Sequence, residues 1–270
     1  MRNILLISGL LFLLLLTSCS TENTDMTKVL FIHHSTGNNV WRGKTNKYIV
    51  KLTNRGDVSK YFARYNRENK TDYIIKDLFF PNEKPYGWKN YPYDYYNIWV
   101  KNAGEKPYME EPTLEILTKQ YDVIIFKHCY PVSRLVADTG NPDIDSEEKR
   151  VENYKLQYEA LKKKMHEFPG TKFIVWTPAV CTQNTITEEQ ARGTNDFYHW
   201  IMDEWDEKGD NIYIWDFYGY ETEGGLYLAE KNASSPDNCH PGDEFSARMA
   251  PLFASFIINV IETERGQEPR

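Results

Sequence analysis

Five short apolar runs, separated by segments of helical character, constrain the fold of this chain more than any other feature. The runs are KVLFIH, YIIKDLFF, DVIIFK, TKFIVWT and NIYIWDF, at 28–33, 73–80, 122–127, 171–177 and 211–217. Continuous apolar runs are typical of strands that are covered on both faces. Strands that alternate with helices favour a parallel sheet, and right-handed crossovers place helices on both of its faces. The sequence therefore predicts a three-layer α/β/α sandwich with a five-stranded parallel sheet, of flavodoxin-like kind.

Helical patterns lie between these runs. In 146–168 the apolar residues are spaced alternately by three and four positions, as on one face of a helix: Val151, Tyr154, Tyr158, Leu161, Met165 and Phe168. Further helices are expected at 58–67, 113–120, 187–206 and 243–262. Thr187 and Gln190 have the spacing of a capping box. Residues 81–112 hold five prolines and many aromatic residues without helical period, which indicates a long functional loop.

The amino-terminal segment has the pattern of an export signal. After Arg2, residues 4–16 form an apolar run that is shorter than the roughly 20 residues of a membrane span. The run ends in Leu-Thr-Ser-Cys at 16–19, which resembles the lipobox of bacterial lipoproteins and implies lipid on Cys19. An ordinary signal peptide with a chance cysteine is the alternative. We expect a signal peptide at 1–18, a lipid-anchored tether at 19–27 and one domain at 28–270, held at a membrane in the periplasm or at the cell surface.

The charge balance excludes some partners. With 32 Lys and Arg against 39 Asp and Glu, the formal net charge is −7, and no block of basic residues exceeds the three lysines at 162–164. This argues against a nucleic-acid partner and against an electrostatic hold on anionic lipid.

Beyond the signal segment, three cysteines remain: Cys129, Cys181 and Cys239. In an oxidising compartment an odd number allows at most one internal disulfide, with three pairings open. No CxxC pair and no Cys/His zinc spacing occurs in the sequence, so neither a metal nor a cofactor is expected.

A candidate nucleophile follows the first strand. The run KVLFIH leads directly into His34-Ser35-Thr36-Gly37, and a hydroxyl on the turn after a parallel strand points into the ligand crevice. Gly37 would allow the backbone to approach a ligand closely. The alternative for Ser35 is a turn residue or a helix N-cap.

A candidate acid–base pair precedes the last helix. Asp237 stands three residues before His240 in the loop DNCHPG, from where its carboxylate can reach the imidazole Nδ1. It would leave Nε2 free to accept the serine proton. Asp196 and His199 have the same spacing, but inside an expected helix such a pair is a routine surface contact. A metal site of His33, His34, Asp237 and His240 is the other alternative.

FIHHSTG after the first strand, with DNCHPG before the last helix, resembles the SGNH (GDSL-type) hydrolase family. The resemblance implies an SGNH hydrolase-like fold and a serine esterase with Ser35, Asp237 and His240 as the catalytic triad. The family usually has Gly-Asp-Ser where this chain has His33-His34-Ser35. It also supplies an oxyanion-hole asparagine after the third strand, where this chain has Lys127 and His128. One of these two side chains would have to replace that donor.

The substrate expected from these features is an ester outside the cytoplasm, with acetylated or similarly acylated carbohydrate as the leading class. The aromatic block YPYDYYNIW at 91–99, with Trp41 and Trp88, could stack on sugar rings or could pack a loop onto the sheet. The alternative function is a glycan-binding lipoprotein that keeps the scaffold without catalysis.

Overall fold

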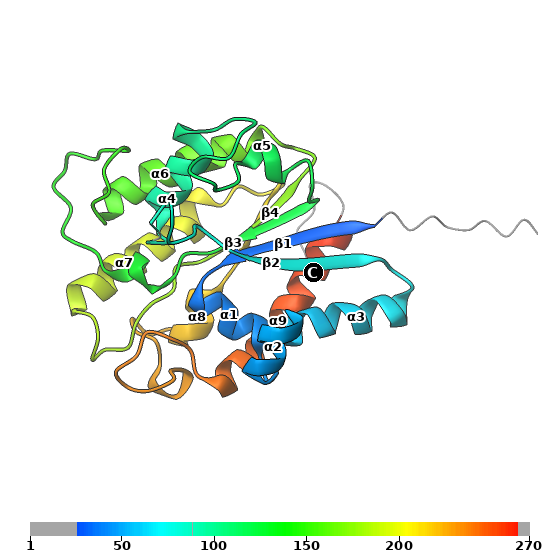
Figure 1. Cartoon of the computed structure of the whole chain (residues 1–270). Helices are drawn as coiled ribbons and strands as arrows, with labels where there is room; N and C mark the ends of the chain where they lie inside the picture. The colour runs from blue at the N-terminus through cyan, green and yellow to red at the C-terminus, as the bar shows by residue number, and fades with distance from the viewer. Residues whose placement is uncertain (1–25, 88, 264–270) are drawn as a thin grey trace, which may run out of the picture.

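The computed structural model describes residues 26–87 and 89–263. The signal segment, Cys19 and the tether up to residue 25 lie outside the described residues, as does Trp88. Within the described part, five parallel strands form one sheet in the order β2-β1-β3-β4-β5 (Figure 1). Their bounds are β1 Thr27–His33, β2 Tyr73–Phe79, β3 Val123–Phe126, β4 Lys172–Trp176 and β5 Ile212–Trp215. The order 2-1-3-4-5 is that of flavodoxin-like sheets, which confirms the predicted fold class.

Helices cover both faces of the sheet (Figure 1). One face carries α1 Ser35–Arg42, α2 Lys47–Thr53, α3 Asp57–Asn69 and α9 Asp243–Glu262. The other carries α4 Pro92–Tyr96, the π-helical turn η1 Asn97–Lys101, α5 Leu114–Leu117, α6 Val151–His166, α7 Glu188–Trp200 and the π-helical turn η3 Ile201–Trp205. The remaining elements are α8 Phe217–Thr222 and the 3₁₀ turns η2 Tyr130–Ser133 and η4 Glu230–Asn232.

The strands divide their side chains between two cores. In β3, Ile124 and Phe126 face the core beneath α4–α7, whereas Val123 and Ile125 face the core beneath α1, α3 and α9. This is the alternation that a sheet covered on both faces requires. By length and composition α9 could span a membrane, but its apolar side chains, such as Phe253 and Ile257, are buried in the second core.

The five predicted strands and the five predicted helices are all present, the latter as α3, α5, α6, α7 with η3, and α9. The capping box is confirmed, because Thr187 Oγ1 accepts the Gln190 N–H at 3.2 Å. The start of β1 at Thr27 places one residue of the predicted tether in the sheet. The helices α1, α2 and α8 were not expected, since each is eight residues or shorter and carries little periodic signal.

The prediction of a loop throughout residues 81–112 is wrong. Pro92 begins α4, and Asp94 accepts the backbone N–H of Tyr91 at 3.4 Å, so a short helix forms and continues into η1. Tyr91, Tyr95 and Trp99 are at most 1% exposed and belong to the core beneath α4–α7. The aromatic block therefore packs the chain onto the sheet, and Trp41 is likewise buried.

Candidate active site

Ser35 and His240 meet at the carboxyl edge of the sheet, where the strand order reverses between β1 and β3. Ser35 is the first residue of α1, directly after β1, and its Oγ lies 2.8 Å from His240 Nε2. Open α/β sheets bind ligands at this switch point. The loop that carries His240 returns to α1, because Asn39 Nδ2 donates to the Pro241 carbonyl at 3.3 Å. The structure thus brings together two of the three predicted triad residues.

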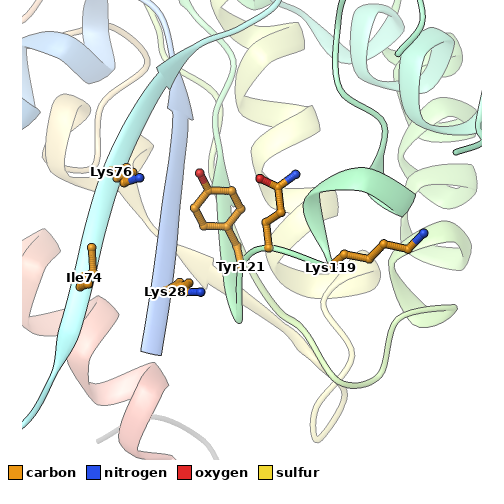
Figure 2. Close-up of a pocket in the computed structure, with 6 residues that line it drawn as sticks. Lys28, Ile74, Lys76, Lys119 and Tyr121 are labelled. Carbon is orange, nitrogen blue, oxygen red and sulfur yellow. The ribbon is translucent and has the colours of Figure 1, made fainter. Parts of the chain in front are cut away.

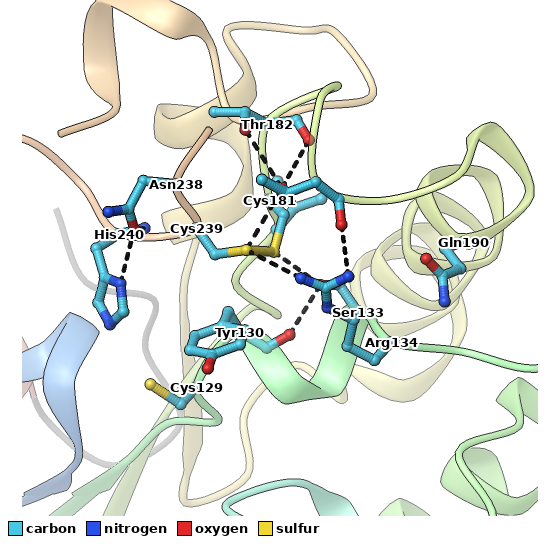
Figure 3. The surroundings of a disulfide bond; sticks show 12 residues. Cys129, Tyr130, Ser133, Arg134, Cys181, Thr182, Gln190, Asn238, Cys239 and His240 are labelled. Atoms are coloured by element: carbon cyan, nitrogen blue, oxygen red, sulfur yellow. Dashed lines mark hydrogen bonds between the residues drawn. A yellow bond between two sulfur atoms is a disulfide. The ribbon is translucent and has the colours of Figure 1, made fainter. Parts of the chain in front are cut away.

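The third partner is Asn238. Its Oδ1 accepts both the His240 backbone N–H, at 3.0 Å, and His240 Nδ1, at 2.9 Å (Figure 3). A backbone N–H can only donate, so the atom that faces it is the amide oxygen and not the amide nitrogen. Nδ1 therefore carries a proton, and Nε2 is left as the acceptor toward Ser35 Oγ.

The predicted contact between Asp237 and His240 is wrong. Asp237 is exposed, and its Oδ1 accepts a hydrogen bond from Asn184 Nδ2 at 3.0 Å. The chain turns so tightly before His240 that the residue two positions back, not three, reaches the imidazole. A neutral amide orients the ring as a carboxylate would, but it supplies no negative charge to the imidazolium.

Cys129 is a further member of the site. Its Sγ lies 3.2 Å from Ser35 Oγ and 3.4 Å from Thr36 Oγ1, and its backbone N–H is held by Asn90 Oδ1 at 2.5 Å. Burial opposes ionisation of the thiol, but the Lys127 charge and the contacts with the Ser35 and Thr36 hydroxyls outweigh it and lower the pKa of Cys129. In the sequence this cysteine stands out only as a possible disulfide partner, since no local motif links the end of β3 to Ser35.

Comparison with known proteins bears on the fold. No protein-family model and no curated protein matches the chain. Among solved structures, it is similar to the crystal structure of a protein from Parabacteroides merdae that is named as a GDSL-like lipase, with a TM-score of 0.50 and 16% sequence identity. The match covers 86% of this chain and 97% of that chain. The two proteins therefore share a fold. At this identity the likeness concerns the scaffold alone.

Neither predicted oxyanion donor is accessible to a ligand, because both side chains are buried. His128 is buried on the opposite side of the sheet, where its ring contacts Tyr95 and Tyr158, with centroids 4.9 and 5.6 Å apart. Lys127 is 1% exposed, and its Nζ has no hydrogen-bond partner among the described residues and lies 5.9 Å from the Trp176 ring. Both expectations are therefore corrected: these side chains lie inside the protein. The donors that remain are backbone N–H groups of the first turn of α1, beginning with Ser35.

Gly37 serves the packing of α1. A Cβ at this position would lie 2.4 Å from His33 Cβ and 3.0 Å from Lys127 Cδ. Only a glycine lets the first turn of α1 come this close to β1 and to the residue after β3. The approach of a ligand to the backbone at Gly37 stays a prediction.

The metal alternative is not supported by the geometry. His33 hydrogen-bonds Asp77 Oδ2 at 3.2 Å and the His34 carbonyl at 2.9 Å, and His34 Nε2 donates to the Pro81 carbonyl at 2.7 Å. Burial lowers the pKa of His34 to about 4. In residues 26–87 and 89–263, no three His, Cys, Asp or Glu side chains are placed to hold a metal ion.

The second Asp-x-x-His pair lies on the surface. His199 is exposed on α7, and its Nδ1 is 3.5 Å from Asp203 Oδ2, one helical turn further along the chain. Asp196 and His199 therefore provide a control pair outside the candidate site.

A disulfide joins Cys181 to Cys239, which confirms that two of the three cysteines pair and leaves Cys129 free (Figure 3). Cys239 immediately precedes His240, so the bond ties the loop of the candidate base to the segment after β4. Arg134 supports this junction, with Nη1 at 2.5 Å from the Thr185 carbonyl and Nη2 at 3.6 Å from Cys239 Sγ.

Denatured, unreduced protein should show one free thiol apart from Cys19, and reduced protein three. The paired variant Cys181→Ala/Cys239→Ala should lower the free energy of unfolding by about 4 kcal/mol, because the bond closes a loop across a separation of 58 residues. Thiol titration and urea unfolding measure the two quantities. Three free thiols in unreduced protein would show that the bond does not form.

The pH dependence of any reaction in which Ser35 is the nucleophile should follow His240. Burial first, and then the charge of Lys127, lower the pKa of His240 below its usual value. A general base acts when neutral, so activity should fall as the pH drops through this pKa, with the acid limb below pH 6.5. Lys127→Met removes the nearby cation and should move the limb to higher pH. A limb that stays in place in this variant would show that Lys127 does not act on His240.

Proposed function

We propose that this protein is a serine hydrolase that cleaves esters. The observation that supports the proposal most strongly is the chain of contacts from Ser35 Oγ to His240 Nε2, at 2.8 Å, and from His240 Nδ1 to Asn238 Oδ1, at 2.9 Å. A nucleophile, a base and a group that orients the base are the three parts that nucleophilic acyl transfer requires. Asparagine in the orienting position has precedent in Cys-His-Asn proteases.

The steps follow from the proton positions. Ser35 Oγ attacks the ester carbonyl carbon while its proton passes to His240 Nε2, and the Nδ1–H bond to Asn238 holds the imidazolium in place. When the tetrahedral intermediate collapses, the bond to the leaving alkoxide breaks and Nε2 returns the proton to that oxygen. Water then attacks the acyl-enzyme, gives its proton to Nε2, and releases the acid and the free Ser35 hydroxyl. Backbone N–H groups at the start of α1 would stabilise the oxyanion in both halves.

Cys129 has a place in this scheme. Its S–H can donate to Ser35 Oγ while the Ser35 O–H donates to His240, because the serine oxygen has one proton and two lone pairs. This contact fixes the Oγ rotamer toward the imidazole. Cys129 is thus a positioning residue in the proposed reaction.

The substrate class we propose is a small acyl ester, such as an acetyl group, on carbohydrate outside the cytoplasm. Support for this class comes from the export signal and not from the aromatic block, whose rings are taken up by the core. The burial of both predicted side-chain oxyanion donors, Lys127 and His128, favours a second candidate, a glycan-binding protein that does not hydrolyse esters.

A substrate panel distinguishes the two candidates. Nitrophenyl acetate, nitrophenyl butyrate and O-acetylated xylan should be hydrolysed, and a fluorophosphonate probe should label Ser35 as read by peptide mass spectrometry. Glycan binding by calorimetry, with no hydrolysis of any ester and no labelling, would assign the second function instead.

We further propose that the protein is a lipoprotein anchored through Cys19. Support comes from the sequence of residues 1–19. Wild-type protein should incorporate a labelled fatty acid and sediment with membranes, because the lipobox pattern directs acylation of Cys19. Cys19→Ala should lose the label. Continued labelling of this variant would contradict the anchor.

A further inference from the structure

A basic segment interrupts the acidic chain between α1 and α3. Residues 41–56 contain five basic side chains and no Asp or Glu, in a protein of net charge −7. The basic residues are Arg42, Lys44, Lys47, Lys51 and Arg55. They are separated from one another, so they form no block of lysines or arginines in the sequence. Two of them, Lys47 and Lys51, lie on the short helix α2.

α2 exposes large apolar side chains within this basic segment. Tyr48 is 71% exposed, Ile49 52% and Leu52 87%, whereas Val50 is buried in the core beneath α1, α3 and α9. The helix is defined at both ends, because the Asn46 side chain accepts the Tyr48 N–H and Asn54 ends it in the left-handed conformation. The three apolar side chains are therefore exposed on a capped helix. Neighbouring exposed apolar residues of this size are typical of an interaction surface.

The edge strand β2 extends the basic surface. A cavity of about 480 Å³ is lined by residues of α2, α3 and β2 that include Arg55, Lys60 and Lys76. The one acidic residue of its lining, Asp77, is engaged by Asn54 Nδ2 at 2.6 Å and by His33 Nε2 at 3.2 Å. Arg42 is paired with Asp243 at 2.5 Å and Lys60 with Asp57 at 3.5 Å. Among the described residues, neither Arg55 nor Lys76 forms an ion pair with an acidic side chain.

A second cavity, of about 290 Å³, continues along β2 and shares Ile74 and Lys76 with the first. Lys28 and Lys119 also line it, and Figure 2 shows these lysines around Tyr121. Lys119 is paired with Glu105, while Lys28 has no acidic partner in the part of the chain that is described. Lys28 is the second residue of β1, so the amino end of this strand lies beside the cavity.

We propose that α2 and the open edge of β2 form a docking face for a membrane surface that contains anionic phospholipid. Tyr48, Ile49 and Leu52 would enter the boundary between headgroups and acyl chains, and the surrounding lysines and arginines would contact lipid phosphates. Basic residues beside an exposed apolar helix face are the pattern of interfacial membrane binding. The apolar side chains favour lipid over an anionic polysaccharide, since a hydrated polymer offers no apolar phase in which to bury them.

The negative net charge of the protein argues against electrostatic attraction to anionic lipid. Dissolved salt, however, screens charges at a protein surface that lie more than about 10 Å apart. The local charge of the face therefore decides the binding. The docking face is inferred from α2 and β2 and does not depend on the lipid anchor proposed at Cys19.

The test uses protein that lacks residues 1–19, so that no lipid anchor contributes while every described residue is kept. Sedimentation with phosphatidylcholine vesicles should be weak, and inclusion of phosphatidylglycerol should produce binding that falls with added salt. Leu52→Asp and the double variant Lys47→Glu/Lys51→Glu should each weaken this binding at least about tenfold. Circular dichroism and thermal unfolding establish that the variants fold.

Val136→Asp and Lys155→Glu serve as matched controls. Val136 is 51% exposed, and both residues line a cavity on the α6–α7 side of the sheet, so these variants should bind vesicles like the wild type. No binding of the wild type to phosphatidylglycerol vesicles, or equal loss in the controls, would overturn the proposal. Binding to an anionic polysaccharide that depends on the lysines but not on Leu52 would assign the face to a polymer. Vesicle binding is measured without ester hydrolysis, so its outcome is independent of the proposed enzymatic function.

Discussion

Ser35→Ala and His240→Ala should each lower kcat/KM for ester hydrolysis by on the order of 10³-fold or more. The first removes the attacking oxygen and the second removes the base 2.8 Å from it. The double variant should be scarcely less active than either single variant, because the two residues act as one unit. Initial rates on nitrophenyl acetate measure all three.

His199→Ala and Asp196→Ala are the controls for this experiment. The pair has the same spacing in sequence as Asp237 and His240 but lies on the exposed side of α7, so neither variant should change the rate more than about twofold. Near-UV circular dichroism should show native packing in every variant. Activity that survives Ser35→Ala but is lost in His199→Ala would contradict the proposed site.

Asn238→Ala should lower kcat/KM roughly 10²-fold, whereas Asp237→Ala should leave it within about twofold. Without the Asn238 oxygen, Nδ1 loses the acceptor that sets the tautomer and the ring orientation, and Nε2 no longer meets Ser35 reliably. Asp237 contacts Asn184 instead of the imidazole, so its loss leaves the ring in place. Initial rates distinguish the arrangement in the structure from the triad that the family resemblance implied.

Asn238→Asp provides the matched gain of charge. A carboxylate at this position still accepts both His240 N–H groups, so the ring orientation is kept. Its negative charge raises the pKa of His240, so the acid limb of the rate profile should move to higher pH, with activity retained above it. A large loss in Asp237→Ala together with an unaffected Asn238→Ala would restore the original triad.

The fold follows from local patterns to a large degree. The inner strands β1, β3 and β4 are covered on both faces, so their apolar composition alone indicates strands. β2 tolerates Lys76 and Asp77 because it is an edge strand. The periodicity of α6 and the capping box of α7 are equally local signals. The short elements α1, α2 and α4 were missed, since their stability comes from contacts outside their own few residues.

The sequence by itself placed Ser35 after the first strand and His240 in the loop before the last helix. Chain order in a parallel α/β sheet brings this first turn and this last loop to one edge. Only the tertiary structure decided the rest of the site. Asn238 faces the imidazole because partners far along the chain shape its loop. Cys181 forms a disulfide with Cys239, and Asn39 donates a hydrogen bond to the Pro241 carbonyl. Cys129 reaches Ser35 only because β3 lies beside β1. Side-chain direction in an irregular loop depends on such distant contacts, and no local periodicity records them.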